Sequence, residues 1–112
     1  MVDIQVTQSH EVTVVALTGD LDTASAPRLK GTLEDLLARG KTRLVLDLFG
    51  VAYIDSAGLG ELVRAMKRSR ECAGDLRVCA LHGDVLRIFE MTRLTEGMGV
   101  YPTLNEAVAS WR

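Results

Sequence analysis

The stretch RLVLD, residues 43–47, carries three consecutive apolar residues between two charged ones. A strand with one covered face alternates apolar and polar side chains, whereas a strand covered on both faces is apolar throughout. Strands of the second kind belong to parallel sheets, in which crossover helices pack on both faces. Residues 43–47 therefore predict a central strand of a parallel sheet.

The segments on either side of this strand switch between strand and helix patterns. Upstream, the runs 4–8 and 12–18 predict a hairpin-like pair of strands, and residues 23–40 predict a helix whose leucines share one stripe. Downstream, the expected elements are a helix over 56–71, a strand over 76–81, a short helix after 83–84, a short strand over 99–101 and a helix that starts at 102–103.

This order of elements is typical of α/β domains with right-handed crossovers. We predict an α/β fold with a mixed, mostly parallel sheet of four or five strands and about four helices, in which the first strand is an antiparallel edge. The 112 residues are expected to form a single domain over 1–112, since domains most often have about 100–150 residues. Binding sites of such sheets lie beyond the carboxyl ends of the strands, which here means residues 47–60.

The composition excludes several classes of function. With 13 Lys and Arg against 15 Asp and Glu, the net charge is −2, so the positive charge that binds nucleic acid is missing. The first residues do not resemble a secretory signal, and the longest apolar tract is too short for a membrane span. We expect a cytoplasmic protein with no nucleic-acid partner and no membrane partner.

The cysteines and histidines do not suggest a metal site. Cys72 and Cys79 lie too far apart for a redox pair, and His10 and His82 stand without other ligands at metal-binding spacing. We expect two buried thiols, no metal and no cofactor.

Residues 55–60, DSAGLG, break the local rules for a helix start. Two glycines in the first helical turns cost about 0.8–1.0 kcal/mol each relative to alanine. One explanation is tight packing against a neighbouring strand, for which glycine leaves room. The other is that a second backbone or a ligand approaches closely at Ser56.

Three enzyme motifs fail on spacing. A nucleophile elbow needs glycine at the position of Ile54, and a dinucleotide fingerprint that starts at Gly58 needs glycine at Val63. Residues 40–42, GKT, resemble the end of a Walker A loop, but the earlier glycine of that motif is missing. We therefore expect no catalytic residues.

Ser56 fits the role of a modified residue better. A serine at a helix N-cap points its hydroxyl outward, where a kinase can reach it. A phosphate adds about −1.5 to −2 charge, which unpaired N–H groups at a helix N-terminus can accept. We expect phosphorylation to preserve the fold and to place a dianion beside Asp55, on a surface that is smooth at Gly58 and Gly60, so that a docked partner is expelled.

Residues 53–60, YIDSAGLG, resemble the signature of the STAS domain of bacterial anti-sigma factor antagonists, in which an aspartate precedes a phosphorylatable serine. Residues 17–22, LTGDLD, are similar to a second segment of that family, and the similar order of elements covers essentially the whole chain. The resemblance implies that Ser56 is phosphorylated by an anti-sigma factor that is itself a serine kinase with a histidine-kinase-like ATPase fold. The partner-binding residues that it implies are Asp22, Asp55, Ser56, Ala57, Gly58, Leu59 and Gly60.

The resemblance also implies a partner-switching cycle. The unphosphorylated antagonist binds the anti-sigma factor and frees the sigma factor for transcription, as in a stress response. The phosphorylated form dissociates from the anti-sigma factor, and a PP2C-type phosphatase restores the unphosphorylated form. The resemblance thus implies that the protein is a substrate and not an enzyme. This sequence has Ala57 where a second serine is common, and residues 92–94, TRL, where Thr-Gly-Leu is common.

Two other functions stay open. The chain could be a STAS adaptor subunit of a lipid-transport or stress-scaffold complex, which binds its partner without a Ser56 cycle. It could also be a small nucleotide-binding or hydrolytic domain that uses the helix start at Gly58 and Gly60 for phosphate.

Overall fold

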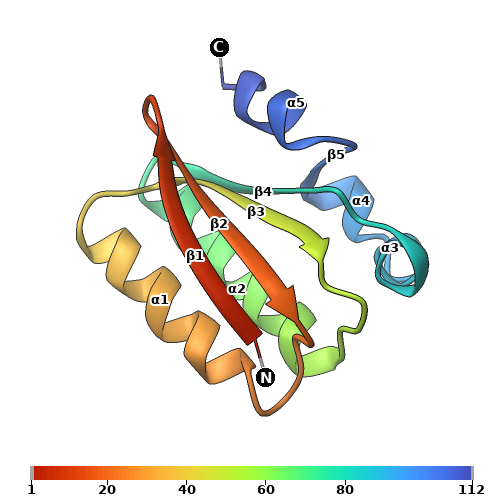
Figure 1. The fold of residues 1–112 in the computed structure, drawn as a ribbon. Helices are drawn as coiled ribbons and strands as arrows, with labels where there is room; N and C mark the ends of the chain where they lie inside the picture. The colour runs from red at the N-terminus through yellow and green to blue at the C-terminus, as the bar shows by residue number, and fades with distance from the viewer. Residues whose placement is uncertain (1, 112) are drawn as a thin grey trace.

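The computed structural model describes residues 2–111, which form one five-stranded sheet and five helices (Figure 1). The strands are β1 (Val2–Ser9), β2 (Val12–Gly19), β3 (Arg43–Gly50), β4 (Asp75–Cys79) and β5 (Gly99–Tyr101), and they follow one another across the sheet in this order. β1 and β2 pair antiparallel, and each later pair is parallel. The predicted mixed sheet, with an antiparallel edge and a central strand at residues 43–47, is confirmed.

The helices are α1 (Ala26–Ala38), α2 (Ser56–Glu71), α3 (Gly83–Met91), α4 (Leu94–Gly97) and α5 (Leu104–Ala109). The single turn α4 is absent from the prediction, because four residues are too few to show a helical period. β4 ends at Cys79 rather than at residue 81, since Ala80 turns the chain with a φ of 62°. No helix within residues 2–111 has the length and apolar character to cross a membrane.

The main core lies between the sheet and the helices α1 and α2, which contact each other; Figure 1 shows α2 behind the strands and α1 to the left of it. Leu44, Leu46 and Leu48 alternate along β3 and are fully buried in this core. Leu33 of α1 and Leu62 of α2 belong to the same cluster. The period of two in the strand and the apolar stripes of the helices thus converge on one layer.

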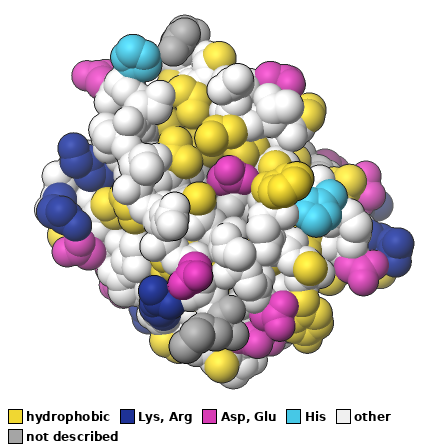
Figure 2. Space-filling model, in the orientation of Figure 1, with side chains coloured by type: hydrophobic (Ala, Val, Ile, Leu, Met, Phe, Trp, Pro, Cys, Tyr) yellow, Lys and Arg dark blue, Asp and Glu magenta, His cyan; other side chains and the backbone are white. Residues whose placement is uncertain are grey.

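The opposite face of the sheet is covered in part by α5. Val45 packs there in a second buried cluster with Cys79 and Ala107. The apolar run of β3 is therefore covered on both faces, which is the reason for its continuity. Phe49 faces the same side further along β3 and is 72% exposed. Figure 2 shows hydrophobic side chains at the surface on this side of the molecule.

The two cysteines differ in their surroundings. Cys79 is buried, and desolvation together with the charge of Asp47 raises the pKa of its thiol to about 12. Cys72 is exposed at the end of α2. The expectation of a buried thiol is therefore wrong for Cys72, because this residue follows the last helical turn instead of facing the sheet.

Two loops at the carboxyl ends of the strands are joined through their backbones. Leu21, after β2, forms an isolated parallel bridge with Ile54, before α2, and both residues are buried. The Leu21 N–H donates to the Tyr53 carbonyl at 3.0 Å, and the Asp55 N–H donates to the Leu21 carbonyl at 3.2 Å. The start of α2 is thus fixed against the segment that leads into α1.

Candidate functional site at the start of α2

Asp55 is the N-cap of α2. Its backbone is extended, with φ of −114° and ψ of −174°, and its Oδ1 accepts the N–H groups of Ala57 at 2.9 Å and Gly58 at 3.0 Å. Aspartate is among the residues that best satisfy the free N–H groups of a first helical turn. The expectation that Ser56 is the N-cap is wrong, because the Asp55 carboxylate takes that role and Ser56 becomes the first helical residue.

The second carboxylate oxygen of Asp55 binds the loop between β2 and α1. Its Oδ2 accepts the backbone N–H of Thr23 at 3.0 Å and the Thr23 hydroxyl at 3.1 Å. These hydrogen bonds, led by the one from Gly58, hold the pKa of Asp55 below its ordinary value. The carboxylate therefore stays charged, and both of its oxygens are occupied by hydrogen bonds to other groups.

Ser56 is exposed on the first turn of α2. The N–H groups of Ala57 and Gly58 are held by the Asp55 side chain, and the Leu59 N–H donates to the Asp55 carbonyl at 2.9 Å. A phosphate on Ser56 finds these three donors occupied. The sequence predicts unpaired N–H groups at the helix start, and at these three positions the unmodified protein does not have them; acceptance of a phosphate by this helix start stays a prediction.

Asp22 organises the turn before α1. Its Oδ1 accepts the Ser25 N–H at 3.0 Å, its backbone N–H donates to the Ser25 hydroxyl oxygen at 2.9 Å, and its carbonyl accepts the Ala26 N–H at 2.8 Å. The bond from the Ser25 backbone is the main reason that the pKa of Asp22 is lowered. Asp22 and Asp55 are thus two ionised carboxylates whose loops meet at Thr23.

The two glycines of the segment have different explanations. Gly58 is buried, and a Cβ at this position would lie 2.5 Å from the Leu21 carbonyl oxygen, so tight packing requires glycine there. Gly60 is exposed, and a Cβ there would have no neighbour within 4 Å. Packing within the chain therefore does not explain Gly60, and its role in contacting a partner stays a prediction. Leu59 is half-buried and packs against the main core.

Comparison with known proteins identifies the family. The sequence profile of the STAS domain matches residues 3–107. The chain belongs to the STAS domain family. It is 34% identical to the anti-sigma-B factor antagonist of Listeria monocytogenes over 82 residues, which are 73% of this chain and 72% of the relative.

Solved structures share the fold of this STAS domain. A crystal structure of an anti-sigma factor antagonist from Mycobacterium paratuberculosis has a TM-score of 0.89 at 27% identity, with 98% of this chain and 93% of the other covered. The Bacillus cell fate determinant SpoIIAA in its phosphorylated form has a TM-score of 0.76 at 20% identity, with 98% and 100% covered.

A groove of about 330 Å³ lies between the first turns of α1 and α2 in this STAS domain. Thr23, Ala57 and Gly60 form part of its wall, so the groove adjoins the Ser56 site. Glu61 is buried in the same wall and binds the Arg64 guanidinium through two hydrogen bonds of 2.9 and 2.8 Å. The hydrogen bonding to Glu61 is the main reason that the pKa of Arg64 is raised.

Sequence reasoning does not single out Thr23 or Glu61 as site residues. In the sequence Thr23 is only the first residue of the helix predicted over 23–40, yet in the structure it binds a carboxylate 32 residues further along the chain. Only its position between two segments that resemble the family signatures could have indicated a role in the site.

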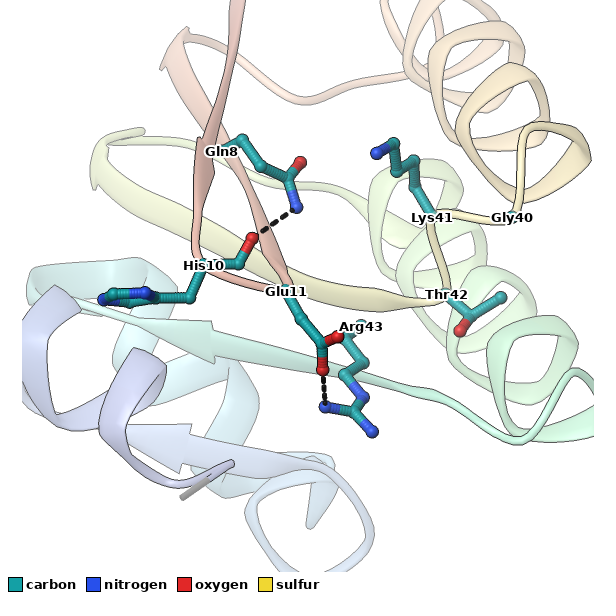
Figure 3. A pocket seen from close by; sticks show the side chains of 7 residues that line it. All are labelled: Gln8, His10, Glu11, Gly40, Lys41, Thr42 and Arg43. Carbon is teal, nitrogen blue, oxygen red and sulfur yellow. Dashed lines mark hydrogen bonds and ion pairs between the residues drawn. The ribbon is translucent and has the colours of Figure 1, made fainter.

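The Walker-like residues 40–42 lie at the other end of β3, beside a pocket of about 400 Å³. Figure 3 shows this pocket between the β1–β2 turn and the loop after α1. The Gly40 N–H donates to the Leu37 carbonyl at 3.0 Å, and the Lys41 N–H donates to the Leu36 carbonyl at 2.9 Å. These two N–H groups bind carbonyl oxygens of the last turn of α1. A phosphate-binding loop instead needs free N–H groups at the start of a helix. The structure thus agrees that the Walker A likeness is accidental.

Proposed function

We propose that this chain is an anti-sigma factor antagonist whose binding to its anti-sigma factor is controlled by phosphorylation of Ser56. The observation that carries the proposal is the exposed Ser56 hydroxyl on the first turn of α2, next to the ionised carboxylate of Asp55. Membership of the STAS domain family and the likeness to the Listeria antagonist support the type of partner. The fold shared with phosphorylated SpoIIAA supports the type of modification.

The partner surface in this proposal consists of Asp22 and residues 55–60. In the unphosphorylated state the anti-sigma factor docks over the start of α2, where Gly60 leaves room for a backbone to approach. Phosphorylation adds about −1.5 to −2 charge at Ser56. Because the neighbouring N–H groups are already bonded, the phosphate remains on the docking surface and repels the partner.

The size of the switch follows from interface energetics. Disrupting a buried polar contact at an interface costs about 2–5 kcal/mol, and each 1.4 kcal/mol changes the affinity about tenfold. Phosphorylation of Ser56 is therefore expected to weaken the complex by about thirtyfold to a few thousandfold.

The cycle needs two enzymes, and this chain is their substrate. The anti-sigma factor acts as a serine kinase with a histidine-kinase-like ATPase fold and transfers the γ-phosphoryl group of ATP to the Ser56 hydroxyl. A PP2C-type phosphatase hydrolyses the phosphoserine and restores binding. Because both carboxylate oxygens of Asp55 already accept hydrogen bonds, the proposal assigns acceptance of the Ser56 hydroxyl proton to the kinase.

The first test is the intact mass of the protein from resting and stressed cells, with tandem mass spectrometry to place a phosphate. We expect a phosphate on Ser56 whose occupancy changes with the condition. Ser56→Ala should retain the anti-sigma factor in a pull-down, and Ser56→Asp should lose it. Thr95→Asp is the matched control, since it adds the same charge at an exposed position in α4.

The opposite result is also informative. If no condition yields phosphate on Ser56 and a partner stays bound throughout, the switch is wrong. The chain is then a STAS adaptor of the non-switching kind.

A further inference from the structure

The Asp55 carboxylate is held from two sides by elements that are distant in sequence. Oδ1 caps α2 through Ala57 and Gly58, and Oδ2 receives both the N–H and the hydroxyl of Thr23. A carboxylate that only capped a helix could turn its free oxygen toward solvent. The backbone N–H and the hydroxyl of Thr23 both donate to Oδ2, so this oxygen is held and does not turn toward solvent.

We propose that Thr23 is a positioning residue for the Ser56 site, whose hydroxyl fixes the Asp55 carboxylate and thereby the direction in which Ser56 presents its own hydroxyl to the kinase. This inference rests on the proposed function. Ser56 directly follows Asp55 and is the first residue of the helix that Asp55 caps. Only one peptide unit separates the two residues, so the conformation of Asp55 determines the direction of the Ser56 side chain.

The loop that carries Thr23 is rigid enough to serve this purpose. Leu21 is buried and paired through its backbone with Tyr53 and Asp55. Ser25 donates its hydroxyl to the Asp20 carbonyl at 2.8 Å, which closes the turn on its other side. Thr23 therefore lies between two anchored residues, Leu21 and Ser25, so the position of its backbone does not depend on Asp55 alone.

Thr23 also lies on the surface that a partner of Ser56 would cover. Its side chain is exposed and lines the groove between α1 and α2 together with Ala57 and Gly60. A substitution at Thr23 is thus expected to affect recognition of the Ser56 site more than the core of the protein, since no part of the main core depends on it.

The test compares Thr23→Val, which removes the hydroxyl, with Thr23→Ser, which retains it. Both variants retain the backbone N–H bond to Asp55. We expect the initial rate of phosphate incorporation at Ser56, measured by intact mass with Mg-ATP and a cell extract of the source organism, to fall about threefold to tenfold in Thr23→Val. Thr23→Ser should stay within about twofold of the unaltered protein.

A second readout separates positioning from a general loss of stability. The pKa of Asp55, followed by the carbon-13 shift of its carboxyl group, should rise in Thr23→Val and should return in Thr23→Ser, because a donor to the charged form is lost and then restored. Thr23→Ala serves as a second variant without the hydroxyl and should behave as Thr23→Val does.

The outcomes are distinguishable. Phosphorylation of both hydroxyl-free variants at the unaltered rate, or an equal loss in Thr23→Ser, overturns the role of Thr23 and leaves the proposed function standing. If the unaltered protein takes up no phosphate in the same extract, the proposed function fails, and the inference fails with it.

Discussion

The carbonyl oxygen of Leu21 lies directly against Gly58, so that a Cβ on Gly58 would stand 2.5 Å from this oxygen. The same Cβ would lie 2.9 Å from side-chain carbons of both Leu21 and Ile54. The carbonyl cannot simply move away, because it also accepts the Asp55 N–H at 3.2 Å. The backbone pairing of Leu21 with Tyr53 and Asp55 therefore requires a residue without a side chain at position 58.

Gly58→Ala should destabilise the fold. Overpacking of a well-packed region costs about 1–3 kcal/mol, and the better helix propensity of alanine returns at most about 1 kcal/mol of that. We expect a net loss of about 1–2 kcal/mol in the free energy of unfolding, measured by urea denaturation. A variant as stable as the unaltered protein would show that the contact with Leu21 relaxes at no cost.

Gly60→Ala is the matched substitution two residues further along α2, and it should have the opposite effect. A Cβ at Gly60 meets nothing within 4 Å, and alanine is favoured over glycine in a helix by about 0.8–1.0 kcal/mol. We therefore expect a higher denaturation midpoint. Under the proposed function the added methyl group also weakens capture of the anti-sigma factor, and unchanged capture would place Gly60 outside the partner surface.

The fold could be predicted because the strongest signals in the sequence are local periods. The apolar run at residues 43–47 and the leucine stripe of α1 each predict which faces of the element are covered. In the structure these faces are buried. The one missed helix is α4, whose single turn carries no period. The prediction of a buried Cys72 failed for a related reason, since residues beyond the last turn of a helix no longer follow its pattern.

The site could be located from the sequence, but its internal geometry could not. Residues 55–60 stand out because glycine is unfavourable in a helix, yet the sequence does not say which glycine is packed and which is open. The choice between Asp55 and Ser56 as N-cap depends on one backbone conformation. The bonds from Thr23 to Asp55 depend on two loops that meet only when the sheet has formed.

Asp55 should make the stability depend on pH in the acidic range. Its pKa in the folded protein is lowered from an ordinary value of 3.8, so its contribution is fully present above that value and is lost as the pH falls through the lower, folded-state pKa. In Asp55→Asn the amide NH₂ cannot accept the two bonds from Thr23. We expect the variant to be less stable at pH 7 and the difference to shrink below about pH 4.

The comparison uses urea midpoints of the two proteins at pH 7, 5, 3 and 2.5. Asp22 also has a lowered pKa, but it titrates in both proteins, so its effect cancels in the difference. A stability difference that stays constant down to pH 2.5 would contradict an ionised, hydrogen-bonded Asp55.

Arg93 is a site where a substitution should stabilise the protein. It has φ of 60° and ψ of 24° just before α4, a left-handed conformation that costs a residue with a side chain roughly 1–2 kcal/mol. Arg93→Gly removes this cost and gives up an exposed contact with Glu96 of 3.9 Å, which contributes little. Because glycine also has more freedom in the unfolded chain, we expect a net gain of about 1 kcal/mol, or about 4–8 °C in Tm.

Arg87→Gly is the control for this prediction. Arg87 is likewise exposed and pairs with Asp84 at 3.1 Å, so both substitutions remove an exposed arginine and one weak ion pair. Arg87, however, lies within α3, where glycine costs about 1 kcal/mol. Thermal unfolding should therefore show the two variants moving in opposite directions, because only the backbone conformation distinguishes them. A shift of both variants in the same direction would mean that charge, and not the left-handed backbone at Arg93, decides the outcome.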